Sequence, residues 1–129
     1  MSLEVTPIYA AILGLLLLYL AKRVVDFRQR DKVTLGAGDS KDLELAIRVH
    51  CNATEYIPIL LVLLLTLELS GAPAWLVHVG GGLTLVARLL HAVGLGGKRG
   101  PSFGRFWGTA LTWLTLLSLA IANLVYLFL

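Results

Sequence analysis

The chain is poor in charged residues and has a single cysteine. Of its 129 residues, 15% are charged and 57% are hydrophobic, and the mean hydropathy is +0.82. A water-soluble domain this small could not bury so much apolar surface, so the composition indicates an integral membrane protein. The one cysteine, Cys51, excludes an internal disulfide and a metal cluster built on cysteines.

The basic residues do not form a nucleic-acid surface. The net charge is +3 and the isoelectric point is about 9.3, values that are compatible with nucleic-acid binding. However, the lysines and arginines flank apolar runs and do not form a patch on a soluble fold, so no nucleic-acid partner is expected. Membrane lipid is the expected surrounding.

Four apolar runs predict four membrane helices in one domain, residues 1–129. The last run, residues 106–129, has no charged side chain and is long enough to cross a bilayer. Glu4 precedes the first run and Lys22 follows it, which favours a retained helix over a signal peptide. Asp39 or Ser40 is the expected N-cap of the second helix. The prediction is an all-α four-transmembrane-helix bundle with helices over residues 5–27, 40–70, 73–96 and 103–129.

The distribution of basic residues predicts the orientation. They concentrate between the first and second runs and between the third and fourth, at Lys22, Arg23, Arg28, Arg30, Lys32, Lys98, Arg99 and Arg105. The positive-inside rule therefore places these two loops in the cytoplasm and both termini outside.

Polar residues in the second run lie on one face. In the stretch "RVHCNATEY", Arg48, Asn52, Glu55 and Tyr56 are spaced i, i+4, i+7 and i+8, which is one stripe of a helix. Ionisable groups facing lipid are costly, so the stripe must face protein or a wet pocket. Pro58 has no N–H and can kink the helix, which would open space beside Glu55.

The other helices contribute polar residues at a matching depth. With the helical rise of about 1.5 Å per residue, Arg88, His91 and Arg105 fall in the same cytoplasmic half as the stripe. Three arginines offer planar forks for carboxylates, and Glu55 can accept from an ammonium. The predicted ligand is a small zwitterionic or anionic molecule with several carboxylates, with a hydrophobic co-substrate entering from lipid. No metal is expected, because His78 lacks a ligand partner at a useful spacing.

Structural interpretations compete with these roles. Glu55 and Arg88 could form an ion pair that only holds two helices together, and His91 could be a hydrogen-bonded packing residue. Other residues are expected to be purely structural. Their roles are outward snorkelling by Glu68, packing by Trp113, close helix contact by His78 and residues 80–82, and positions off the stripe for His50 and Cys51. On position alone, Lys98, Arg99 and Arg105 could be ordinary interfacial anchors.

Over nearly its whole length the chain resembles the membrane-associated proteins in eicosanoid and glutathione metabolism, the MAPEG family. The most specific piece is R-x-x-x-N-x-x-E-Y-x-P, present as Arg48, Asn52, Glu55, Tyr56 and Pro58. The segment "KVTLGAGDSKDLELAIRVHCNATEYIPI" resembles the bacterial branch in particular, and "ARLLHAVGL" and "GRFWGTALT" are similar to the later helices.

The resemblance implies a homotrimer in the bacterial inner membrane, with glutathione as co-substrate bound between neighbouring subunits. It implies that Arg48, Asn52, Glu55 and Tyr56 hold glutathione and that Arg88 and His91 line the same site. The thiolate-stabilising, catalytic arginine would be Arg105, with Arg99 as the lesser alternative. One of Arg23, Arg28 and Arg30 is a further candidate for contact with the ligand.

The implied activity is that of a glutathione transferase or peroxidase. A guanidinium beside the sulfur favours the thiolate, which attacks a hydrophobic electrophile or a lipid hydroperoxide. Eicosanoid-making relatives have a tyrosine where this chain has Leu95, which disfavours a dedicated eicosanoid activity. The alternatives are a non-catalytic lipid-binding or scaffold protein on the same fold, and a small proton-coupled exporter built around Glu55.

Overall fold

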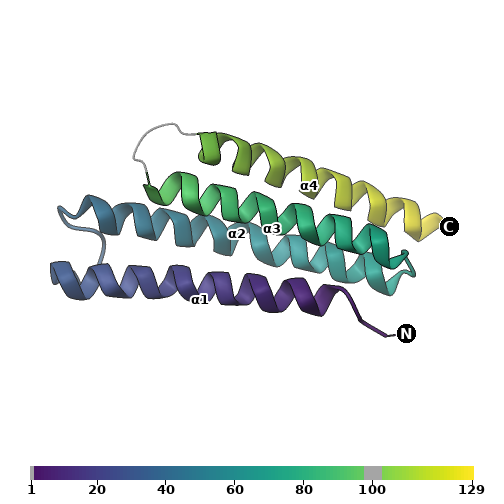
Figure 1. Ribbon diagram of the computed structural model, residues 1–129, viewed down its shortest axis with the longest axis horizontal. Coiled ribbons are helices and arrows are strands. Elements are labelled where there is room, and N and C mark those ends of the chain that lie inside the picture. Colours follow the sequence, from purple (N-terminus) through teal and green to yellow (C-terminus); the bar gives the residue numbers. More distant parts are fainter. Residues whose placement is uncertain (1, 98–102) are drawn as a thin grey trace.

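The structure, a computed structural model, describes residues 2–97 and 103–129 (Figure 1). Within these residues the chain forms four helices and no strand: α1 Thr6–Asp31, α2 Lys41–Leu69, α3 Ala74–Gly97 and α4 Phe103–Phe128. Each contains a span that is long and apolar enough to cross a membrane. The predicted all-α bundle of four membrane helices is therefore confirmed.

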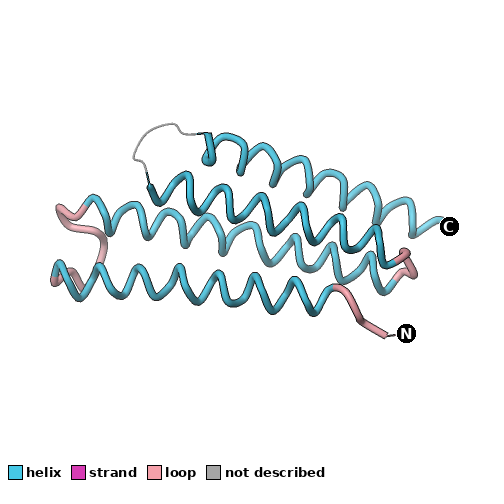
Figure 2. The backbone as a smooth tube through the Cα atoms, in the orientation of Figure 1, coloured by secondary structure: helices cyan, strands magenta, loops and turns pink. Residues whose placement is uncertain are grey.

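The helices lie side by side along one long axis (Figure 2). In the views of Figures 1 and 2, α2 and α3 lie between α1 and α4. Both termini are at one end of the bundle with the α2–α3 turn, and the α1–α2 loop is at the opposite end. We call the half that contains the α1–α2 loop the loop half.

The helix bounds differ from the prediction chiefly at the end of α1. The predicted end was residue 27, whereas α1 continues to Asp31. Its C-cap is Lys32, whose φ of 53° is left-handed. The extra turn is polar, so the apolar run ended before the helix did. At the start of α2, Ser40 is the N-cap, and its hydroxyl accepts from the N–H of Leu43 at 3.2 Å.

Glycines let α4 approach α3 closely in the loop half. A Cβ built on Gly108 would lie 2.5 Å from the backbone nitrogen of His91, and one on Gly104 would lie 2.7 Å from the carbonyl oxygen of Leu90. A Cβ on Gly94 would likewise overlap the backbone nitrogen of Arg105. Because only glycine fits these positions, the start of α4 is held against the end of α3, beside His91.

Glu68 stabilises the start of α1, and the expectation that it only extends outward is wrong. Its carboxylate accepts hydrogen bonds from the backbone N–H groups of Glu4 and Val5 at 2.8 Å and of Thr6 at 2.7 Å. No side-chain cap comes from the N-cap residue Val5 itself. A carboxylate at a helix N-terminus satisfies unpaired donors and complements the helix dipole, so Glu68 of α2 caps α1 from a distance in sequence.

The glycine run in α3 serves close packing, as expected. A Cβ on Gly81 would overlap the ring of Tyr9, and one on Gly80 would lie 2.8 Å from the side chain of Leu119. The Tyr9 hydroxyl lies 3.1 Å from both Nδ1 and the carbonyl oxygen of His78. His78 therefore contributes to the contact between α1 and α3.

Candidate functional site

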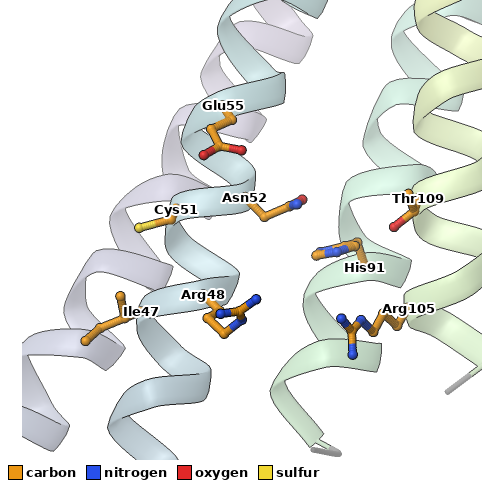
Figure 3. Close-up of a pocket in the computed structure, with 8 residues that line it drawn as sticks. All are labelled: Ile47, Arg48, Cys51, Asn52, Glu55, His91, Arg105 and Thr109. Carbon is orange, nitrogen blue, oxygen red and sulfur yellow. The ribbon is translucent and has the colours of Figure 1, made fainter. Parts of the chain in front are cut away.

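A cavity of about 460 Å³ opens in the loop half between α2, α3 and α4 (Figure 3). This volume is within the range of small-molecule sites. Five of the seven predicted site residues line it. The full lining is Ile47, Arg48, Cys51, Asn52, Glu55, His91, Arg105 and Thr109.

Two ionisable groups on the α2 wall of the cavity have no partner in the part of the chain that the structure describes. Arg48 and Glu55 are both exposed, and neither makes a hydrogen bond or ion pair to any residue that the structure describes. Both lie within Lys41–Leu69, the candidate membrane span of α2. A charge at this depth needs a counter-charge, a hydrogen-bonding partner or water. Arg48 and Glu55 are therefore open to a ligand, to water or to a second protein surface.

Arg88 lies behind the cavity and is not part of its lining. It is 2% exposed, and its Nη2 donates to Asn52 Oδ1 at 2.6 Å while its Nη1 donates to Thr112 Oγ1 at 3.3 Å. Among the described residues it forms no ion pair with Glu55. The purely structural Glu55–Arg88 pair considered above is therefore not formed within the chain.

The contact with Arg88 fixes how Asn52 faces the cavity. A guanidinium can only donate hydrogen bonds, so the amide atom facing it must be the oxygen. The two N–H donors of Asn52 then remain for the cavity, and they have no partner in the described part of the chain. Asn52 consequently presents a hydrogen-bond donor to any ligand.

Tyr56 also lies just outside the lining. Its ring is 5.5 Å from the Arg88 guanidinium carbon, and its hydroxyl accepts a hydrogen bond from Trp113 Nε1 at 2.9 Å. Trp113 was expected only to pack, and sequence reasoning also missed Thr109. Thr109 is four residues and Trp113 eight residues after Arg105, and this spacing is the signal that could have placed both on the Arg105 face of α4.

His91 and Cys51 lie on the cavity wall in different ways. His91 is 3% exposed, and its Nδ1 has no partner among the described residues. In Figure 3 the ring projects from α3 into the space between the helices. Cys51, expected to lie off the stripe, belongs to the lining, but Figure 3 shows its sulfur turned away from α3.

Arg105 reaches the cavity from the start of α4. Figure 3 shows its side chain extending from α4 toward the side of α2 that carries Arg48. Arg99, the lesser alternative for the same role, and Lys98 lie outside the described residues. Arg105 is thus the catalytic candidate that the structure places at the cavity.

The three arginines of the first loop region do not line this cavity. Arg28 Nη1 donates to the carbonyl oxygen of Gly36 at 2.8 Å, which holds the α1–α2 loop. Arg30 pairs with Asp31 at 2.7 Å and with Asp42 at 3.0 Å, and Arg23 lies 5.8 Å from the centre of the Phe27 ring. Contact of any of them with a ligand stays a prediction.

The cavity therefore combines several donors with one carboxylate. Arg48, Arg105 and Asn52 offer N–H groups, and Glu55 is the acidic residue of the lining. The set suits a ligand with more than one carboxylate and one ammonium. Across residues 2–97 and 103–129, no group of three or more His, Cys, Asp or Glu residues could hold a metal ion.

Comparison with known proteins identifies relatives over almost the full chain. The family model of the MAPEG family matches residues 6–125. Inner membrane protein YecN of Escherichia coli strain K12 is 40% identical over 123 residues, which cover 95% of this chain and 92% of that protein. The protein of the same name from Escherichia coli O6:H1 strain CFT073 has the same identity and coverage. No solved structure matches the chain significantly.

Proposed function

Because this chain belongs to the MAPEG family, we propose that it is a glutathione-dependent membrane transferase or peroxidase. It would activate the glutathione thiol for attack on hydrophobic electrophiles or lipid hydroperoxides. The observation that carries the proposal is the cavity itself, where Arg48 and Glu55 have no partner among the described residues and lie beside further N–H donors in a candidate membrane span.

Glutathione matches the cavity group by group. It has two carboxylates, one ammonium, amide groups and a thiol. Arg48 and Asn52 would donate to its carboxylate or carbonyl oxygens, and Glu55 would accept from its ammonium. Arg88 would act indirectly, since it holds Asn52 and does not line the cavity. His91 would face the ligand with its Nδ1, which has no partner among the described residues.

We further propose that the active form is a homotrimer with the site between neighbouring copies. One face of α2 is exposed in the single chain, and it carries Glu44, Arg48, Cys51, Glu55 and Val62 at spacings of three, four and seven residues. An exposed stripe with this helical repeat, charged within a membrane, needs a protein surface to cover it. Native mass spectrometry of the detergent-solubilised protein tests this, and a monomer as the sole species would refute it.

Arg105 would favour the thiolate form of bound glutathione. A free thiol with a pKa of about 8.5 is mostly protonated at neutral pH, and a nearby guanidinium favours its anion. The sulfur then attacks an electrophilic carbon, and the leaving group departs with the bonding electron pair. With a hydroperoxide, it attacks the terminal oxygen, the O–O bond breaks, and the alkoxide leaves and takes a proton from solvent to become the alcohol. The thiol of a second glutathione then attacks the sulfenic acid, which gives the disulfide and water. The protein contributes positioning and charge.

The test is thiolate formation on the purified protein. Adding glutathione at neutral pH should produce ultraviolet thiolate absorbance with the wild type but not with Arg105→Ala, whose turnover should fall about 100-fold. Lys22→Ala is the matched control, because it removes a basic side chain that does not line the cavity and pairs only with Asp26 among the described residues. If the wild type forms no thiolate and Arg105→Ala changes nothing, the enzymatic proposal is wrong and a binding or scaffold role is favoured.

The proposed location is the bacterial inner membrane, with both termini outside and the loop half toward the cytoplasm. The name of the YecN relatives and the basic residues beside the α1–α2 loop support it. Protease should then remove a C-terminal tag from intact spheroplasts. Protection of the tag until the membrane is broken would contradict this orientation.

A further inference from the structure

Trp113 is anchored by a polar contact in the middle of an apolar helix. Trp113 is 59% exposed, and its Nε1–H donates to the Tyr56 hydroxyl at 2.9 Å. An indole N–H in lipid has no water to bond, so leaving it without an acceptor is costly. The contact with Tyr56 therefore constrains both rings.

The Trp113–Tyr56 bridge lies directly beside the cavity. Thr109, one turn before Trp113 on α4, lines the cavity, and so does Glu55, which precedes Tyr56 on α2. Tyr56 is one residue, and Trp113 one helical turn, further from the α1–α2 loop than these two lining residues. This hydrogen bond therefore joins α4 to α2 at the end of the cavity that is further from the α1–α2 loop.

The direction of this hydrogen bond determines what Tyr56 can offer. Tryptophan is only a donor, so the Tyr56 oxygen accepts and its hydroxyl proton remains available. The Arg88 guanidinium, which lies over the Tyr56 ring, has only donors and so cannot accept this proton either. Among the described residues, Tyr56 donates no hydrogen bond of its own. Its proton thus remains available to a group that is not part of the described chain.

We infer that Trp113 is a positioning residue of this site, which holds Tyr56 so that the phenol donates to a carboxylate or carbonyl oxygen of bound glutathione. The inference rests on the proposed function. Trp113 does not touch the ligand in this scheme. It acts through Tyr56, and its loss should weaken glutathione binding without altering the attack of the thiolate.

A double-variant comparison tests the inference. Tyr56→Phe removes the donor, and Trp113→Phe removes the N–H while keeping an aromatic ring. Each should raise the KM for glutathione about two- to tenfold, the value of one neutral hydrogen bond, with kcat changed less than twofold. In the double variant the KM should equal that of Tyr56→Phe alone, because Trp113 has no further route to the ligand.

Two further variants separate positioning from general packing. Trp113→His keeps an N–H donor, so its KM for glutathione should lie between those of the wild type and Trp113→Phe, even where both variants lower the melting temperature. Trp75→Phe is the matched control, since Trp75 is 66% exposed near the start of α3 and does not line the cavity. Its KM should equal that of the wild type.

The outcomes distinguish this inference from the proposed function. A wild type that does not bind glutathione, measured by calorimetry, would refute both. A wild type that binds, combined with an unchanged KM in Trp113→Phe or with effects that multiply in the double variant, would refute only the role of Trp113.

Discussion

Replacing Asn52 with aspartate reverses the hydrogen-bonding character of one wall of the cavity. In the structure, the amide oxygen of Asn52 accepts from Arg88 Nη2 at 2.6 Å, and the amide N–H groups are left for the ligand. An aspartate keeps the oxygen that Arg88 needs and turns that contact into an ion pair. The cavity side, however, changes from a donor to a negative acceptor.

The expected effects on stability and on binding have opposite signs. The Asn52→Asp protein should melt at or above the wild-type temperature, because its partner Arg88 gains a carboxylate. Glutathione affinity should fall about 10- to 100-fold, since a hydrogen bond to a charged group contributes roughly 1.5–3 kcal/mol and about 1.4 kcal/mol is tenfold. Repulsion between the new carboxylate and those of glutathione acts in the same direction.

Asn123→Asp is the matched control because its amide is used in the opposite way. Asn123 Nδ2 donates to the carbonyl oxygens of Leu63 and Leu119, both at 2.9 Å, and aspartate cannot replace that donor. This variant should lose roughly 2 kcal/mol of stability and keep its glutathione affinity. Calorimetric titration and thermal unfolding in detergent measure both quantities. Tighter glutathione binding by Asn52→Asp would show that Asn52 accepts from the ligand and would refute the reasoning.

Two other positions, Glu68 and Gly108, test contacts that hold the helices of the bundle together. Glu68→Ala should lower the free energy of unfolding by about 2 kcal/mol, because three N–H groups at the start of α1 lose their acceptor, while Glu68→Gln should lose less. Equal melting temperatures for Glu68→Ala and wild type would contradict the capping role. Gly108→Leu should push α4 away from His91 and abolish glutathione binding, whereas Gly14→Leu, where a Cβ meets nothing within 4 Å, should change it less than twofold. Titrations that show the same loss for both glycine variants would refute this account of the α3–α4 contact.

Much of the candidate site was predictable because it follows helical periodicity. Arg48, Asn52 and Glu55 fall on one stripe by spacing alone, and the structure places all three on one cavity wall. The depth argument also brought His91 and Arg105 to the same level, because the helical rise is constant. Their roles toward glutathione stay predictions.

Other features depend on contacts between helices, to which periodicity within one helix gives no access. The sequence could not show that Arg88 contacts Asn52 rather than Glu55, or that Trp113 contacts Tyr56. The cap provided by Glu68 was missed for the same reason, since it joins residues more than 60 positions apart.

The sequence by itself determined that this protein is a bundle of four membrane helices with a polar stripe on the second. Hydrophobicity and the period of 3.6 residues are local properties, and they are written in the order of the residues. Only the tertiary structure decided which polar groups pair and which stay open to a ligand. That choice depends on how closely α4 approaches α3 across Gly108 and on which rotamers then meet, as in the contact of Arg88 with Asn52.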